Sequence, residues 1–127
     1  MEPVFLTLDE VLAIHEDRIR RYGGSFGVRD LALLQSAIGT VEATFEGGYL
    51  HGTLFEMAAA YLFHIARNHP FVDGNKRAAL ACSLAFLHLN DITIVARPDA
   101  LYDLVIGMAS GRRTKADAAV FFQTHKR

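Results

Sequence analysis

Residues 54–89 read LFEMAAAYLFHIARNHPFVDGNKRAALACSLAFLHL, and this stretch decides the fold. Its first part, residues 54–66, and its last part, residues 78–89, are apolar on almost every face, which is typical of helices buried on most sides. Two such helices in a chain of 127 residues must both lie in its centre. The polar segment 69–76 connects them. The sequence therefore predicts a central helical hairpin whose polar connecting loop stands on a rigid scaffold.

Two further helices are predicted before this hairpin. Thr7-Leu8-Asp9-Glu10 has the form of a capping box, and the apolar spacing after it predicts a helix that runs to about Arg21. Gly23-Gly24 can adopt the left-handed conformation that ends this helix. Asp30 is placed to cap a second helix, with Gly39 as its end. The apolar face of that second helix comprises Leu31, Leu34, Ala37 and Ile38.

The remaining segments predict a loop, a short extended stretch and two more helices. Residues 40–53 contain three glycines and read as an exposed loop or flap, and residues 93–95 as an edge strand or extended turn. A helix capped near Asp99 is expected to end by Gly111. Residues 114–117 form a second capping box, which begins a last helix that buries Val120, Phe121 or Phe122. We expect an all-α bundle of about six helices in one domain, residues 1–127.

Composition limits the kind of partner. The chain has 13 Lys plus Arg and 14 Asp plus Glu, so its net charge of -1 supplies no basic field for nonspecific binding of nucleic acid. No apolar run approaches the about 20 residues of a membrane span, and the N-terminus does not resemble a secretion signal. The one cysteine, Cys82, lies in an apolar run and predicts a buried thiol in a reducing compartment. We expect a cytoplasmic protein.

The polar loop has the residue types of an anion site. Gly74 followed by Asn75 lets the backbone turn sharply just before a helix, so that successive N–H groups point into one concavity. Lys76 and Arg77 add positive charge at the same place. An Asp-Gly-Asn sequence alone is an ordinary turn. Its position between two buried helices, beside two cations, is what favours a phosphate site.

The same loop contains a candidate base and a candidate metal ligand. Pro70 restricts His69 to extended conformations and ends the preceding helix, which leaves the imidazole free to accept a proton from an attacking nucleophile. Asp73 supplies a hard oxygen ligand suited to magnesium carried by nucleotide phosphates. Phe71 is expected to anchor the loop in the core. A lone histidine at a helix end is usually a cap or a surface residue, so the functional interpretation depends on the whole set.

The loop HPFVDGNKR, residues 69–77, resembles the signature of the Fic/Doc family. That pattern is approximately His-x-Phe-x-Asp/Glu-Gly-Asn-Gly/Lys-Arg, and every defined position is filled here. The resemblance extends to residues 22–24, 27–30 and 54–89. The chain length is similar to that of the Doc branch, the death-on-curing toxins, rather than to the longer Fic proteins. The resemblance implies the Fic/Doc fold, with His69 as general base, Asp73 as magnesium ligand, and Gly74, Asn75, Lys76 and Arg77 holding the phosphates of ATP.

Two departures from the Fic pattern favour the Doc branch. Lys76 stands where Fic proteins usually have a second glycine, and Leu80 where they usually have a second arginine. Doc-like enzymes are protein kinases that phosphorylate a threonine of elongation factor Tu and so arrest translation. Lys76 would crowd the phosphate cradle and add charge, so we expect ATP to bind in another orientation and to offer a different phosphorus for attack.

Other functions remain open at this point. The alternatives are a Fic-type transferase of AMP to a protein hydroxyl and a noncatalytic binding module that has kept the fold. Many Fic proteins inhibit themselves through a Ser/Thr-x-x-x-Glu segment, which this sequence lacks. A Doc-like toxin would instead be restrained by a separate antitoxin, whose disordered tail folds on binding. A zinc hydrolase is disfavoured because the histidines lack the spacing of zinc ligands.

Overall fold

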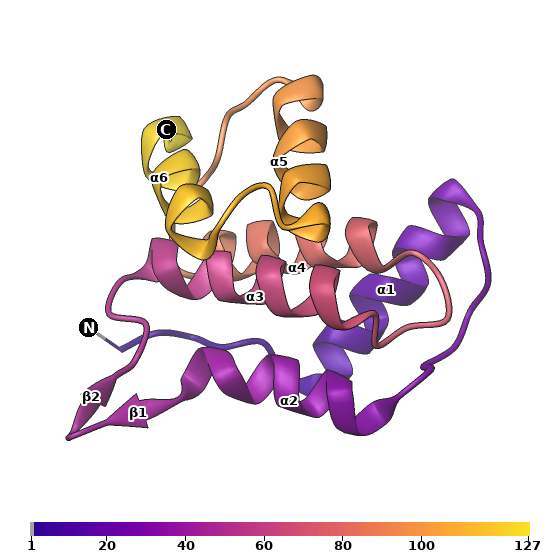
Figure 1. Cartoon of the computed structure of the whole chain (residues 1–127), viewed down its shortest axis with the longest axis horizontal. Coiled ribbons are helices and arrows are strands. Elements are labelled where there is room, and N and C mark those ends of the chain that lie inside the picture. Colours follow the sequence, from indigo (N-terminus) through magenta and orange to yellow (C-terminus); the bar gives the residue numbers. More distant parts are fainter. Residues whose placement is uncertain (1) are drawn as a thin grey trace.

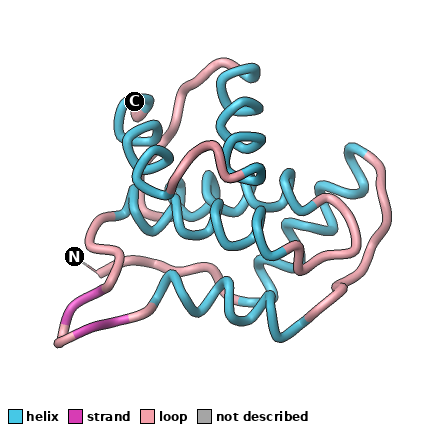
Figure 2. The backbone as a smooth tube through the Cα atoms, in the orientation of Figure 1, coloured by secondary structure: helices cyan, strands magenta, loops and turns pink. Residues whose placement is uncertain are grey.

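The computed structural model describes residues 2–127 and contains six helices and one two-stranded sheet over that range (Figure 2). The helices confirm the predicted all-α class. The short strands are antiparallel and lie between the second and third helices. The elements in chain order are α1 (Leu8–Tyr22), α2 (Leu31–Glu42), β1 (Thr44–Phe45), β2 (Gly48–Tyr49), α3 (Leu54–Asn68), α4 (Asn75–Leu89), α5 (Pro98–Ser110) and α6 (Lys115–His125).

Helices α3 and α4 form the predicted central hairpin (Figure 1). Helices α2 and α6 pack on α3, α1 packs on α4, and α5 contacts both members of the hairpin. In the view of Figure 1, α5 and α6 lie on one side of the hairpin and α1 and α2 on the other. The hairpin is therefore covered by helices on both sides, and its connecting loop lies between α1 and α5.

The core is apolar, and the hydroxyl of its buried tyrosine has a hydrogen-bond partner. The side chains of Phe86, Phe122 and Tyr61 are fully buried, and the Tyr61 ring lies 5.1 Å from the Phe86 ring between centroids. The Tyr61 hydroxyl accepts a hydrogen bond from the Leu6 N–H at 3.0 Å, which satisfies its oxygen inside the core. Cys82 is fully buried as predicted, and burial raises the pKa of its thiol to about 12.

The predicted capping signals are confirmed at three helices. Thr7 and Glu10 form both hydrogen bonds of a capping box at the start of α1, and Gly23 ends that helix with φ of 86°. At α6 the capping box is complete as well, with Thr114 as the N-cap. Asp30 caps α2 by accepting a hydrogen bond from the Leu33 N–H. Each of these helices starts where its own sequence satisfies the free N–H groups of its first turn.

One predicted helix boundary is wrong, and a second lies slightly away from its predicted position. Helix α2 does not end at Gly39 but continues to Glu42, because Gly39 lies on an open face and nothing forces it out of the helical conformation. Helix α5 starts slightly before the predicted cap near Asp99, with Arg97 at the N-cap and Pro98 at the first helical position, and it ends by Gly111 as predicted. Proline suits that position because its fixed φ is helical and no N–H is lost from the helix.

The predicted apolar face of α2 is narrower than expected, whereas the burial predicted for α6 is confirmed at Phe122. Leu31 is 49% exposed and does not contribute to the buried face of α2. In α6, Phe122 is fully buried, Phe121 is partly buried against the core, and Val120 is 63% exposed. Of the three alternatives predicted for α6, Phe122 is the one that anchors the helix in the core.

The predicted loop contains more regular structure than expected, and the predicted extended segment pairs with the C-terminus. The end of α2 and the β1–β2 hairpin occupy much of residues 40–53. Residues 93–95 are extended, and Ile94 forms an isolated antiparallel bridge with Lys126. Among residues 2–127, no helix combines the length and the apolarity required to cross a bilayer.

Candidate active site

The α3–α4 loop begins with an unusual backbone conformation. His69 ends α3 with φ of 50° and ψ of 54°, in the left-handed region, and is exposed. This contradicts the extended conformation that the following proline predicts. Hydrogen bonds from the Arg29 side chain explain the difference. Arg29 donates to the carbonyl of His69 at 2.7 Å and to that of Asn68 at 2.9 Å, which stabilises the left-handed end of α3. The reversal of the chain at His69 is thus stabilised from the α1–α2 loop.

The α1–α2 loop also holds the middle of the α3–α4 loop. The backbone N–H groups of Arg29 and Asp30 both donate to the Pro70 carbonyl, at 2.8 and 3.0 Å. Val72 donates its N–H to the Gly27 carbonyl at 3.0 Å. These backbone contacts join two segments that are about forty residues apart in sequence, and they fix the path of residues 69–72.

Phe71 and Asn75 close the loop on itself. The Asn75 side chain accepts a hydrogen bond from the Phe71 N–H at 2.9 Å and donates one to the Phe71 carbonyl at 3.1 Å. The Phe71 side chain is 1% exposed and belongs to the core. The amide of Asn75 is therefore engaged within the loop, and what Asn75 offers to an anion is its backbone N–H.

Asp73 is exposed, and two backbone donors favour its ionised form. Its carboxylate oxygens accept hydrogen bonds from the Ser25 N–H at 3.1 Å and from the Gly74 N–H at 2.8 Å. These two donors hold the pKa of the Asp73 carboxyl below its usual range. Gly24 lies so close that a Cβ atom there would meet the Asp73 carboxylate at 2.7 Å. The carboxylate is fixed in place by the segment that follows α1.

The start of α4 presents free backbone N–H groups. Gly74 is the N-cap with φ of 72°, and Ala78 is the first residue of α4 to donate back, to the Gly74 carbonyl at 2.9 Å. The N–H groups of residues 75–77 therefore have no acceptor within the helix, and they carry the positive end of its dipole. A Cβ atom at Gly74 would approach Ile19 Cδ1 to 2.9 Å, so only glycine fits this turn without a shift.

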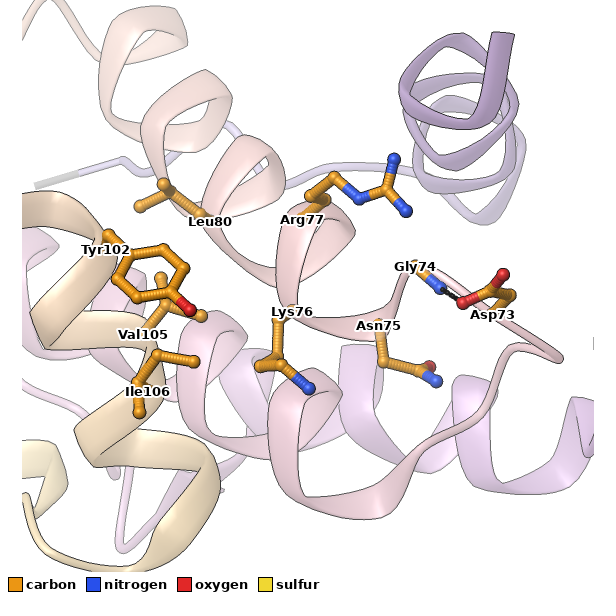
Figure 3. A pocket seen from close by; sticks show the side chains of 9 residues that line it. All are labelled: Asp73, Gly74, Asn75, Lys76, Arg77, Leu80, Tyr102, Val105 and Ile106. Atoms are coloured by element: carbon orange, nitrogen blue, oxygen red, sulfur yellow. Dashed lines mark hydrogen bonds between the residues drawn. The ribbon is translucent and has the colours of Figure 1, made fainter. Parts of the chain in front are cut away.

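The two cations of the loop have different surroundings. Arg77 donates a hydrogen bond to the Gly23 carbonyl at 2.9 Å, and its guanidinium carbon lies 6.0 Å from the centre of the Tyr22 ring. Figure 3 shows Arg77 directed toward α1 and Lys76 lying between the two ends of the cavity. Lys76 is exposed. Arg77 is thus already engaged with the end of α1, whereas Lys76 is directed at the cavity.

A cavity of about 440 Å³ opens between the start of α4 and α5. One end is polar and is formed by the loop, and the other end is apolar and is formed mainly by α5 (Figure 3). His69 is not part of its lining. The residues that line it are Asp73, Gly74, Asn75, Lys76, Arg77, Leu80, Tyr102, Val105 and Ile106.

Reasoning from sequence missed the α5 wall of this cavity. Tyr102, Val105 and Ile106 lie three and four positions apart, so their spacing indicates one face of a helix. That spacing does not indicate which other element the face approaches. The spacing of residues along the chain also gives no sign of the contact that His15 makes, in which its Nε2 donates to the Asp73 carbonyl at 2.8 Å.

A resident metal site made by protein ligands alone is absent from residues 2–127, where no three His, Cys, Asp or Glu side chains come together. Asp73 still fits a magnesium ion, because its carboxylate is exposed and ionised and because Mg²⁺ in phosphate sites is usually held by one or two carboxylates plus substrate oxygens. Most ligands would then come from the nucleotide and from water.

The chain is similar to proteins whose functions are known. The model of the Fic/DOC family matches residues 5–87, which include α1 and the whole 69–77 loop. The protein named Protein kinase doc, from Escherichia phage P1, is 39% identical over 112 residues, which are 87% of this chain and 86% of the phage protein. Toxin Doc of Mycolicibacterium smegmatis is 44% identical over 75 residues, or 59% of this chain and 58% of that protein.

Proposed function

We propose a function for this chain from the premise that it belongs to the Fic/DOC family, which the match over residues 5–87 and the two relatives establish. The chain is a toxin that transfers the γ-phosphoryl group of ATP to a threonine hydroxyl of elongation factor Tu and so arrests translation. One observation carries this proposal. A single cavity combines the phosphate cradle of the 69–77 loop with an apolar wall on α5.

The polar end of the cavity suits the phosphates. The free N–H groups of residues 75–77 and the dipole of α4 attract an anion, and Lys76 adds a full charge beside them. Because the Asn75 side chain is engaged with Phe71, binding falls to backbone groups and the two cations. Arg77 contributes from a position set by the Gly23 carbonyl.

The apolar end suits the nucleoside, and its shape bears on which phosphorus is attacked. Leu80, Tyr102 and Ile106 offer surface for a base and a sugar, in a volume of about 440 Å³ that is typical of small-molecule sites. Fic proteins usually carry an arginine at the position of Leu80, which would extend the polar end. With Leu80 and Lys76 in place, the polar region is confined to the start of α4. This arrangement favours presentation of the terminal phosphorus.

His69 acts as the general base. It is exposed at the start of the loop and lies outside the cavity lining, so it is accessible to a protein hydroxyl that approaches from solvent. In the transfer step the threonine oxygen forms a bond to the γ-phosphorus while the bond from that phosphorus to the bridging oxygen breaks. The threonine proton passes to the His69 imidazole, and ADP leaves with the bridging oxygen.

Asp73 would hold a magnesium ion that accompanies ATP. When bound there, the ion would neutralise charge on the phosphates. The contribution of the chain itself is a carboxylate fixed by Ser25 and Gly74, whose pKa below its usual range keeps it ionised at neutral pH.

Membership of this family leads us to expect one protein partner besides the substrate, namely an antitoxin. One relative is named as a toxin and another as a protein kinase. We expect a cognate antitoxin that restrains this chain in the cytoplasm, where its target, elongation factor Tu, acts. Nucleic acid is not an expected partner, since the net charge is -1.

The test is incubation of the purified chain with elongation factor Tu, ATP and Mg²⁺, followed by peptide mass spectrometry and a cell-free translation assay. The proposal predicts one phosphothreonine on the factor and loss of translation, both dependent on ATP. An unmodified factor together with unimpaired translation would contradict the proposed target. Omission of Mg²⁺ is expected to abolish the modification.

A further inference from the structure

We infer that His15 is a positioning residue for the 69–77 loop: it fixes the Asp73 backbone from α1 and thereby sets the Asp73 carboxylate and the phosphate cradle. This inference rests on the proposed function, because it concerns the same site. His15 is not itself among the residues that line the cavity, and it touches no reacting atom that we have placed. Its effect on transfer must therefore pass through Asp73.

Two contacts orient the His15 ring: a stack on Phe71 and a hydrogen bond to the Asp73 backbone. Its ring stacks on the Phe71 ring at 3.8 Å between centroids, with an angle of 3° between the planes. Its Nε2 lies 2.8 Å from the Asp73 carbonyl oxygen, and since a carbonyl only accepts, this nitrogen carries the proton. The side chain is buried, with 4% of the residue exposed. One aromatic ring therefore holds two points of the loop at once.

The surroundings make the position of Asp73 sensitive to this bond. Gly74 follows directly, and a Cβ atom there would lie 3.8 Å from His15 Nε2 and 2.9 Å from Ile19 Cδ1, so α1 packs closely against the turn. The Asp73 carboxylate accepts from the Ser25 N–H, which comes from the segment just after α1. Loss of the His15 bond would leave the Asp73 carbonyl without this donor. The turn at residues 73 and 74, which positions the first N–H groups of α4, would then be held less firmly against α1.

A structural role alone would not require a histidine. A phenylalanine at position 15 would preserve stacking on Phe71, and any large apolar residue would fill the space. Only a ring or an amide with an N–H at the position of Nε2 can also reach the Asp73 carbonyl. Two substitutions separate these functions: His15→Phe keeps the stack and removes the donor, and His15→Gln supplies an amide donor without the ring.

The first readout is amide hydrogen exchange by NMR in the ligand-free chain, which requires no activity. In His15→Phe the Ser25 and Gly74 amides, both bonded to the Asp73 carboxylate, are expected to exchange about fivefold faster, as for loss of one hydrogen bond. In His15→Gln they are expected to remain near the wild-type rate. Val11→Ala is the matched control, because Val11 is fully buried on the same helix and makes none of these loop contacts.

The second readout is transfer. His15→Phe is expected to raise the Mg²⁺ concentration for half-maximal transfer, and the KM for ATP, by about 10-fold or more, the effect typical of removing an outer support of a metal ligand. His15→Gln is expected to recover most of the loss, and Val11→Ala to leave both values unchanged at equal folded fraction. Should His15→Phe not fold, His15→Leu serves the same comparison.

Failures of the two proposals are distinguishable. If the wild-type chain transfers nothing while the exchange pattern is as expected, the proposed function is wrong and the positioning role stands. Unchanged exchange at Ser25 and Gly74 in His15→Phe would overturn the positioning role, whatever the activity. Equal acceleration in Val11→Ala would overturn it as well, since the effect would then reflect global stability.

Discussion

The polar residues of the 69–77 loop divide into those that hold the loop and those that face the cavity. The Asn75 side chain belongs to the first group, because both of its hydrogen bonds go to Phe71. Lys76 and Asp73 belong to the second: like Asn75 they line the cavity, but their charged groups are exposed. The residue types and the order of this loop indicated a candidate site, and the structure places residues 73–77 at one cavity. Which side chain holds the loop and which faces the cavity depends on contacts within the loop and with α1, and the spacing of residues in the sequence does not reveal these contacts.

Removal of the proposed base should separate chemistry from binding. We expect His69→Ala to abolish transfer while changing the Kd for ATP less than about twofold, because His69 does not line the cavity. Single-turnover transfer and calorimetric binding of MgATP measure the two effects. The matched control is His88→Ala, which removes another exposed imidazole at the far end of α4. Full activity in His69→Ala would show that the general-base assignment is wrong.

The apolar wall should determine nucleotide affinity. We expect Tyr102→Ala to weaken ATP binding by about tenfold, as for loss of one aromatic surface that stacks on a base, and Tyr102→Phe to bind normally. Tyr102 is 69% exposed on α5, so neither substitution should alter the core. Titration calorimetry with ATP and with inorganic triphosphate provides the comparison, since triphosphate binding should not change. Equal losses for both ligands would contradict a nucleoside at this end of the cavity.

At the scale of elements, the sequence predicted the starts of α1, α2 and α6 correctly and placed the end of α2 too early. Starts are encoded locally by Thr7, Asp30 and Thr114, whose side chains satisfy N–H groups within three residues. Ends depend on what lies nearby in space. Gly39 continues a helix because its surroundings are open, and His69 adopts a left-handed conformation that is supported by Arg29 from another segment.

Gly74 lies in a crowded turn and Gly39 on an open helix face, so we expect alanine substitutions at the two positions to have opposite effects on stability. Gly74→Ala should destabilise the fold by about 1–3 kcal/mol, because φ is 72° and a Cβ atom would lie 2.9 Å from Ile19 Cδ1. Gly39→Ala should stabilise it by about 0.5–1 kcal/mol, because alanine suits a helix and nothing lies within 4 Å of its Cβ atom. Urea unfolding measures both changes. Equal effects of the two substitutions would contradict this account of the loop.

At the scale of the molecule, the central hairpin was predictable and the cavity was not. Residues 54–66 and 78–89 are apolar on nearly all faces, so their burial follows from composition alone. The cavity forms where α5 approaches the start of α4, and this approach is a property of the whole packing. Helix α5 has an ordinary amphipathic sequence, which is compatible with several placements.

Packing between distant elements also predicts a dependence of stability on pH. His64 on α3 lies 3.2 Å from Lys115 Nζ on α6, and Lys115 Nζ is 3.5 Å from His51 Nε2. Burial, assisted by the charges of Lys115 and His51, lowers the pKa of His64 to about 4. His64 becomes protonated near pH 6.5 in the unfolded chain but only near pH 4 in the native chain. The free energy of unfolding should therefore fall as the pH falls through this range.

We expect this loss to amount to about 1–2 kcal/mol after allowance for solvent screening around a half-buried group. Urea unfolding at a series of pH values measures it. His64→Gln should flatten the curve between pH 4 and 6.5, whereas His88→Gln should leave it unchanged, because His88 is exposed. A curve that is equally steep in His64→Gln and in the wild type would show that His64 is not the group responsible.

The identity of the transferred group is the central claim, and one measurement tests it most directly. The purified chain is incubated with elongation factor Tu and ATP that carries a label at either the α or the γ phosphorus, and the intact mass and label of the factor are read afterwards. The account predicts label from the γ position only, with the mass gain of a phosphoryl group. Label from the α position with the mass gain of AMP would contradict it, and would show that Lys76 and Leu80 do not exclude nucleotidyl transfer.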